Sequence, residues 1–125
     1  MSLREFKDLL PMICNGDTSQ DPGGWTKNNP LWGHCAVVSL LAQDVFGGEL
    51  LRASLEGTEF AKMRSHYWNK LPTFGEVDFT GPQFGDNYPE YLRSTVRERD
   101  YLLSNPETKR RYRLLAERFK KLKPA

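Results

Sequence analysis

The sequence is poor in cysteine and contains no long apolar run. Cys14 and Cys35 are its two cysteines among 125 residues. Two are too few for a disulfide framework, so we expect both to be free thiols. No apolar stretch approaches the ~20 residues that a membrane span needs, and the N-terminus lacks the basic-then-apolar pattern of a signal peptide. These absences predict a cytoplasmic protein with no membrane partner.

The sequence also lacks a strong excess of positive or negative charge, because the formal net charge is only +2. The charge is unevenly distributed, since residues 93–123 hold 11 Lys or Arg and 4 Asp or Glu. Such a basic segment can bind nucleic acid or an acidic protein. Its apolar residues recur every three or four positions, however, which favours an amphipathic helix with a solvated basic face. We therefore expect no nucleic-acid partner.

Hydrophobic periodicity predicts one α+β domain over residues 1–125. The expected helices are residues 3–13, residues 35–46 and a helix that starts after Ser104 or Asn105, and the expected strands are residues 49–55, 65–71 and 76–80. A further short helix, with Tyr91 among its apolar members, is expected within residues 89–103. Pro11 should end or kink the first helix. The Gly- and Pro-rich residues 15–30 form a long loop before the second helix.

The central apolar segment raises a question about its first residue. Residues 35–46 are apolar on almost every side, which predicts a buried helix that begins at Cys35. A cysteine on an apolar helix usually serves core packing. At a helix N-terminus, however, the dipole lowers the pKa of a thiol and favours the nucleophilic thiolate. Cys35 is therefore either a small core residue or a candidate nucleophile.

Two residues downstream could complete a nucleophilic site. A cysteine nucleophile needs a base, and the base needs an acceptor that orients it. A turn centred on Pro72 would place His66 and Asp78 directly opposite each other on one face of a hairpin. Opposed residues have Cβ atoms ~5 Å apart, within reach of an imidazole–carboxylate hydrogen bond. We expect the helix that carries Cys35 to pack on this same face.

Three blocks of the sequence resemble one known family. The blocks are NPLWGHCAVVSLLAQDVFGGELL, SHYWNKLP followed by GEVDFTGPQF, and RERDYLLSNPETKRRYRLLAERF, within residues 29–122. Together they resemble the small bacterial YunG-like proteins, which we associate with the papain-like (NlpC/P60-like) cysteine peptidase superfamily. The resemblance implies an α+β fold with a papain-like core, in which a buried Cys-bearing helix packs on a small antiparallel sheet and C-terminal helices lie outside. It also implies a catalytic triad of Cys35, His66 and Asp78.

The resemblance further suggests which residues surround the triad. The family pattern is Gly-Gln-Cys, whereas this chain has His34 before its cysteine, which makes His34 a candidate oxyanion or substrate contact. Papain-like enzymes use a Gln six residues before the Cys as an oxyanion donor, and Asn29 occupies that position. Asn before Pro is also common turn chemistry. Trp32 and Trp68 flank the candidate Cys and His and could wall a substrate cleft.

The sequence therefore favours a cysteine hydrolase or acyl-transferase that acts on an amide or thioester bond of a peptide-like or acyl substrate. In this interpretation Cys35 attacks, His66 acts as base and then as acid, and Asp78 orients His66. The candidate residues lack the spacing of a zinc motif, so we expect no metal and no cofactor. The alternative is a non-enzymatic binding or regulatory module with a vestigial triad, which the His34 substitution and the short chain favour.

Overall fold

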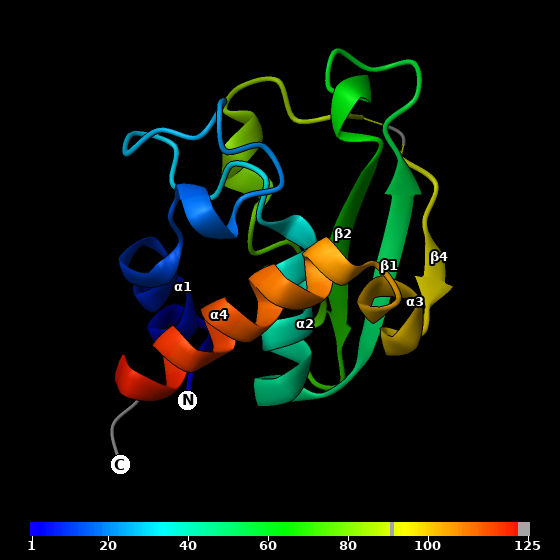
Figure 1. The fold of residues 1–125 in the computed structure, drawn as a ribbon. Helices are drawn as coiled ribbons and strands as arrows, with labels where there is room; N and C mark the ends of the chain where they lie inside the picture. The colour runs from blue at the N-terminus through cyan, green and yellow to red at the C-terminus, as the bar shows by residue number, and fades with distance from the viewer. Residues whose placement is uncertain (91, 123–125) are drawn as a thin grey trace.

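The computed structural model describes residues 1–90 and 92–122. These residues form an α+β fold with four α-helices and a four-stranded antiparallel sheet of order β3-β2-β1-β4 (Figure 1). The helices are α1 (Leu3–Ile13), α2 (Cys35–Phe46), α3 (Arg99–Leu103) and α4 (Pro106–Leu122). The strands are β1 (Glu49–Ser54), β2 (Ser65–Leu71), β3 (Gly75–Val77) and β4 (Thr95–Arg97). Short 3-10 helices lie between them: η1 (Gly16–Thr18), η2 (Ala61–Met63) and η3 (Gly81–Phe84).

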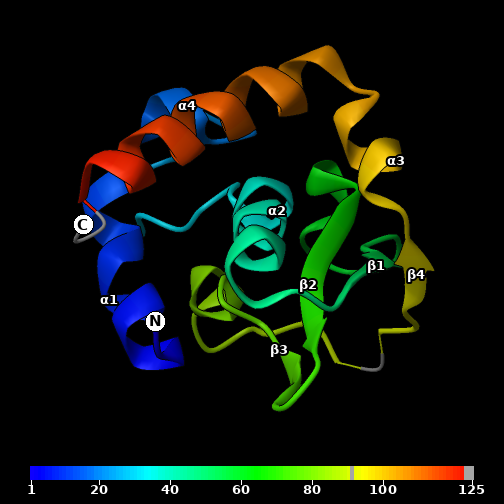
Figure 2. The same ribbon diagram turned by 90° about the horizontal axis from the view of Figure 1, so that it is seen from below.

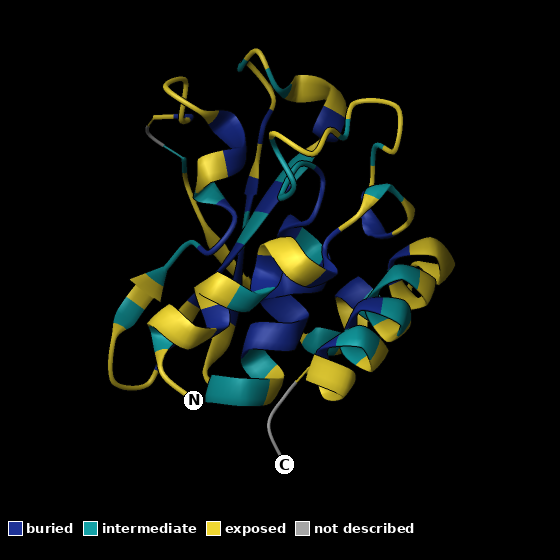
Figure 3. Ribbon diagram, turned by 90° about the vertical axis from the view of Figure 1, so that its left-hand side faces the viewer, coloured by how far each residue is buried: buried dark blue, intermediate teal, exposed yellow. Residues whose placement is uncertain are grey.

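Helix α2 lies at the centre of the fold (Figure 2). The residues of its middle turns are buried, as their dark blue colour in Figure 3 shows. The helix ends at Gly47, whose φ of 76° lies in the left-handed region that favours glycine. The helix predicted over residues 35–46 is confirmed, and its burial fits a segment that is apolar on almost every side.

Helices α1 and α4 cover α2 on the side away from the sheet (Figure 2). Their buried side chains Phe6, Leu115 and Phe119 form one core cluster with apolar residues of α2. The predicted start of α4 is confirmed, because the Asn105 side chain accepts hydrogen bonds from two N–H groups of the first turn. Pro11 does not end α1, since it lies exposed in the last turn and the helix continues beyond it.

The β2–β3 hairpin has a different register from the expected one. Asn69 lies opposite Val77, so the turn is centred one residue later than Pro72. His66 and Asp78 are therefore not directly opposed, and the partner of each residue moves by two positions. Because side chains alternate with a period of two, both still lie on the same face. The pair can meet only on the diagonal of the hairpin.

The expectation that α2 packs on the His66 face is wrong. The Asn69 side chain donates to the carbonyl oxygen of Ser39 in α2 over 2.9 Å. Asn69 and His66 are separated by an odd number of positions on β2, so their side chains point to opposite faces of the sheet. The large apolar side chain Leu71 shares the Asn69 face and packs in the α2 core. The His66 face is covered instead by the chain after η3, where Leu92 packs near Trp68.

The segment between β3 and α4 differs most from the expectation. Residues 89–103 contain the strand β4 and the five-residue helix α3 rather than one short helix, and β3 is shorter than the expected strand 76–80. Strand β4 pairs with β1 at the edge of the sheet. Its three residues are too few for an alternating pattern to be recognised. Tyr91 lies outside the described residues.

Helix α4 is amphipathic, as its sequence predicts. Leu115 and Phe119 are buried, while Lys120 and Lys121 are exposed. Throughout the described part of the chain, no helix combines the length and the apolar composition that crossing a membrane requires.

Candidate active site

Cys35 is the first residue of α2, and 5% of its surface is exposed. The side chain of the N-cap residue, His34, forms no hydrogen bond with the N–H groups of the first turn. No acidic residue lies in that described turn. The positive end of the helix dipole is therefore not neutralised by an acidic side chain. The thiol donates a weak hydrogen bond to the carbonyl oxygen of Ser65, 3.8 Å away at the start of β2.

His66 is the next residue on β2, and its buried ring bonds to Asp78. The ring Nε2 lies 2.6 Å from Asp78 Oδ2. Burial alone lowers the pKa of His66, but the hydrogen bond to Asp78 and the negative charges of Cys35 and Asp78 raise it to about 9. The imidazole is therefore charged at neutral pH. Its other nitrogen, Nδ1, is buried and has no hydrogen-bond partner in the described chain, while the thiol contacts the carbonyl oxygen of the preceding residue, Ser65. The structure thus brings together Cys35, His66 and Asp78.

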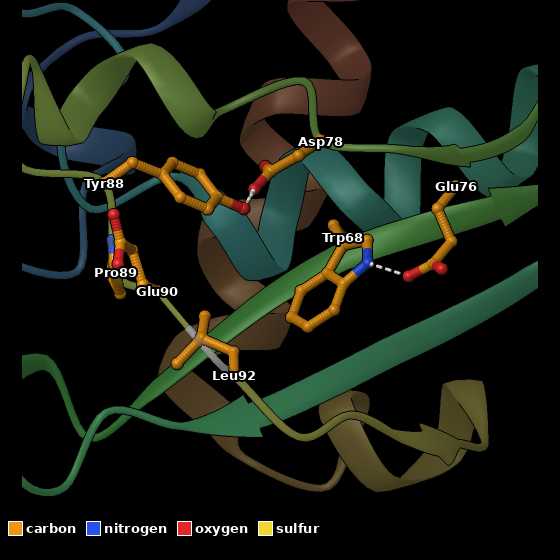
Figure 4. A pocket seen from close by; sticks show the side chains of 7 residues that line it. All are labelled: Trp68, Glu76, Asp78, Tyr88, Pro89, Glu90 and Leu92. Atoms are coloured by element: carbon orange, nitrogen blue, oxygen red, sulfur yellow. Dashed lines mark hydrogen bonds between the residues drawn. The ribbon is translucent and has the colours of Figure 1, made fainter.

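Aromatic side chains enclose the His66–Asp78 pair. Trp68 stacks on the His66 ring at a centroid distance of 5.5 Å, and the edge of Phe84 approaches that ring at 4.9 Å. The Tyr88 hydroxyl donates to Asp78 Oδ2 over 2.5 Å (Figure 4). Burial, followed by this contact, raises the pKa of Tyr88. The carboxylate thus accepts two hydrogen bonds at one oxygen, which fixes its orientation toward the imidazole.

A cavity of about 670 Å³ lies beside this pair, between the sheet and the segment of Tyr88, Pro89, Glu90 and Leu92 (Figure 4). Its wall includes Trp68, whose Nε1 donates to Glu76 over 2.8 Å, and the Asp78 carboxylate. Cys35 is not part of this wall. This cavity borders the orienting carboxylate and not the candidate nucleophile.

Asn29 and Trp32, predicted from the sequence to be near the site, hold the loop before α2 together. The Asn29 amide donates to the carbonyl oxygen of Gln83 over 2.9 Å. The Trp32 indole donates to the Asp21 carboxylate over 3.0 Å. Both side chains are only partly exposed. The polar atoms with which they would bind a substrate are thus bonded within the protein.

His34 is fully buried, and both of its ring nitrogens have protein partners. Nδ1 lies 2.9 Å from the carbonyl oxygen of Trp32, and Nε2 lies 2.7 Å from the Thr18 hydroxyl. Because a carbonyl can only accept, Nδ1–H donates to Trp32 and Nε2 accepts from Thr18. Burial lowers the pKa of His34 to about 4, so the ring is neutral at pH 7. The ring fastens the loop that leads into α2.

Gln83 is a residue of this region that the sequence reasoning did not identify. Its Oε1 accepts a hydrogen bond from the Gly33 N–H over 3.0 Å. That N–H needs an acceptor, so the amide nitrogen Nε2 must point the other way. Nε2 is buried and has no hydrogen-bond partner in the described chain. This buried donor without a partner belongs to a side chain that bonds to Gly33, two residues before Cys35. No motif marks a Gln within a Gly-Pro-Gln-Phe turn.

Neither a metal cluster nor a known relative adds a role to these residues. In residues 1–90 and 92–122, no group of three or more His, Cys, Asp or Glu side chains could hold a metal ion. A family model described as "YunG protein" matches residues 2–123. The comparisons with curated proteins and with solved structures gave no match. The roles of these residues therefore depend on their geometry.

Proposed function

The chain belongs to the YunG protein family, and we propose that it is a cysteine hydrolase or acyl-transferase with a papain-like core. The supporting observation is the buried hydrogen bond between His66 and Asp78, together with the Cys35 thiol, which contacts the carbonyl oxygen of Ser65 next to His66 and leaves the unpaired His66 Nδ1 for the thiol. This is the order nucleophile, base and orienting acceptor that thiol catalysis needs. The bond cleaved is an amide or thioester of a peptide-like or acyl substrate.

The reaction begins from a thiolate–imidazolium pair. The charged His66 stabilises the Cys35 thiolate, whose sulfur bonds to the carbonyl carbon of the substrate. The bond to the leaving nitrogen or sulfur then breaks, and the leaving group takes a proton from His66. Neutral His66 next removes a proton from water, which attacks the acyl-thioester and releases a carboxylic acid. An amine in place of water would make the protein an acyl-transferase.

The tetrahedral intermediate carries a negative oxygen that needs hydrogen-bond donors. The backbone N–H of Cys35 belongs to the first turn of α2, where such groups have no acceptor within the helix. We assign the second donor to the unpaired Nε2 of Gln83, which is anchored by its bond to Gly33. The role expected of Asn29 passes to Gln83, because the Asn29 amide is already bonded to the Gln83 backbone.

Gln83→Met is expected to slow acyl transfer on the order of 100-fold while leaving the alkylation of Cys35 nearly unchanged. Alkylation by iodoacetamide displaces iodide and forms no oxyanion, so it does not need the amide. Hydrolysis of an aryl thioester and alkylation would be measured on the same protein. Asn29→Ala is the control, and it should affect both rates little. A parallel fall of both rates in Gln83→Met would instead indicate that Gln83 only supports Gly33.

The proposal itself is tested by incubating the protein with an aryl thioester and following its intact mass. We expect one acyl group on Cys35, located by peptide mapping, and its later release by water. Cys14 is an internal control, because burial raises the pKa of its thiol to about 12. Cys35→Ala should take up no acyl group. Acylation of both thiols at similar rates, or of neither, would contradict the proposal.

One observation favours a second candidate, a non-enzymatic binding or regulatory module with a vestigial triad. Cys35 exposes 5% of its surface and His66 exposes 0%, so little of the pair is open to a substrate. In this case the fold keeps the three residues only for packing. Such a module would form no acyl-protein, and its Cys35 would alkylate no faster than an ordinary thiol.

A further inference from the structure

A second cavity, of about 510 Å³, lies on the thiol side of the candidate active site. Its wall includes Gly33 and Ala36, which stand on either side of Cys35 in the chain. It also includes Ser65, whose carbonyl oxygen contacts the thiol. Cys35 itself is not part of this wall, but its neighbours on both sides are, so a group bonded to the sulfur lies next to this cavity. The cavity in Figure 4 instead borders Asp78.

Three arginines from distant parts of the chain line this cavity: Arg52 of β1, Arg64 before β2 and Arg111 of α4. Within residues 1–90 and 92–122, none of them forms an ion pair. Other arginines are paired with acids: Arg99 with Asp44, Arg110 with Glu107, and Arg118 with Asp17. Glu107 also lines the cavity, and its pairing with Arg110 leaves an excess of positive charge there.

Two of these arginines are held in unfavourable settings. Arg111 is half-buried, and its Nε has no hydrogen-bond partner in the described chain. Burial lowers the pKa of Arg111, while the negative charges of Glu107 and of a Cys35 thiolate oppose this shift. Arg64 has a φ of 67°, in the left-handed region that favours glycine. Neither setting helps folding, and both are typical of groups retained for a ligand.

From this geometry we infer that the cavity binds a carboxylate of the substrate, so that the acyl compound attacked by Cys35 carries a free carboxylate. The inference rests on the proposed function of Cys35. A guanidinium binds a carboxylate through two parallel N–H···O bonds, and more than one arginine faces the cavity. Tyr67 and Tyr101 on the same wall offer further hydroxyl groups. A neutral substrate would leave three arginine charges in this cavity without a partner.

The test compares two electrophiles of equal size, N-iodoacetylglycine and N-iodoacetylglycinamide. N-iodoacetylglycine ends in a carboxylate, whereas N-iodoacetylglycinamide ends in a neutral carboxamide. With both, the Cys35 sulfur bonds to the CH₂ carbon, the carbon–iodine bond breaks and iodide leaves. The measured quantity is the rate with the carboxylate probe divided by the rate with the neutral probe. We expect this ratio to be about 10-fold or more higher for Cys35 than for the free thiol 2-mercaptoethanol.

The cavity is identified by variants of its arginines. Arg52→Gln and Arg111→Gln should each reduce the ratio of the carboxylate-probe rate to the neutral-probe rate toward that of 2-mercaptoethanol. Arg113→Gln removes an exposed arginine of the same helix and should keep the preference. No preference in the unchanged protein, or an equal loss in Arg113→Gln, would overturn the inference. Failure of the proposed function would appear separately, as a slow reaction of Cys35 with the neutral probe.

Discussion

Replacing His66 with Gln is expected to slow the alkylation of Cys35 by iodoacetamide on the order of 100-fold at pH 6.5. His66 carries a positive charge at this pH, because Asp78 and Cys35 outweigh the effect of burial on its pKa. Gln is polar and similar in size but cannot carry that charge, so the thiolate would lose its counter-ion. An ordinary thiol, with a pKa of about 8.5, is roughly 1% thiolate at pH 6.5. This fraction sets the size of the effect.

His34→Gln is the matched control for this experiment. It replaces a second fully buried histidine, which precedes Cys35 in the chain. Its ring is bonded to Thr18 and to the Trp32 backbone and is neutral. We therefore expect it to change the alkylation of Cys35 by less than about 3-fold. Equal slowing in both variants would point to a packing defect and contradict the role of the imidazolium.

Asp78→Ala is expected to lower the free energy of unfolding by about 3 kcal/mol at pH 6.5. The change leaves the buried His66 ring without its carboxylate, so the ring must lose its proton on folding. Glu76→Ala is the control. It removes an exposed carboxylate on β3 that bonds to Trp68, and should cost less than about 1 kcal/mol. Urea unfolding measures both, and equal losses would contradict the importance of the buried pair.

The pH dependence of stability gives the His66–Asp78 pair a second readout. The pKa of His66 is higher in the folded protein than in the unfolded chain, where it is about 6.5. The stabilisation is therefore fully present below pH 6.5 and is lost as the pH rises through about 9. The unchanged protein should lose stability across this window, and Asp78→Ala should lose much less. A constant difference between the two proteins from pH 6 to pH 10 would contradict the charge assigned to His66.

Local patterns were sufficient to predict the elements that carry the site. The apolar run that begins at Cys35 and stops at Gly47 defines α2, and Asn105 marks the start of α4. The register of the β2–β3 hairpin could not be predicted. Alternation determines which face a side chain occupies, but registers that differ by two residues satisfy it equally well. Strand β4 exists through its pairing with β1, which no local pattern encodes.

Some residues of the candidate site could likewise be predicted from local patterns, whereas others depend on tertiary packing. His66 and Asp78 share a face in either register, so the error in the turn did not separate them. Gln83 and Tyr88 reach the site from the chain after β3, whose path across the sheet depends on tertiary packing. The arginines of the second cavity come from three separate elements. Only the fold reveals that such positions are neighbours.

The central claim is that Cys35 acts as a thiolate held by the charge of His66. The most direct measurement is the rate of Cys35 alkylation by iodoacetamide from pH 5 to pH 10, followed by peptide mass mapping. The account predicts a rate that is already high near pH 6 and changes little up to pH 8, and that becomes steeply pH-dependent in His66→Gln. A rate that rises about tenfold per pH unit up to pH 8 in the unchanged protein, as for an ordinary thiol, would contradict it.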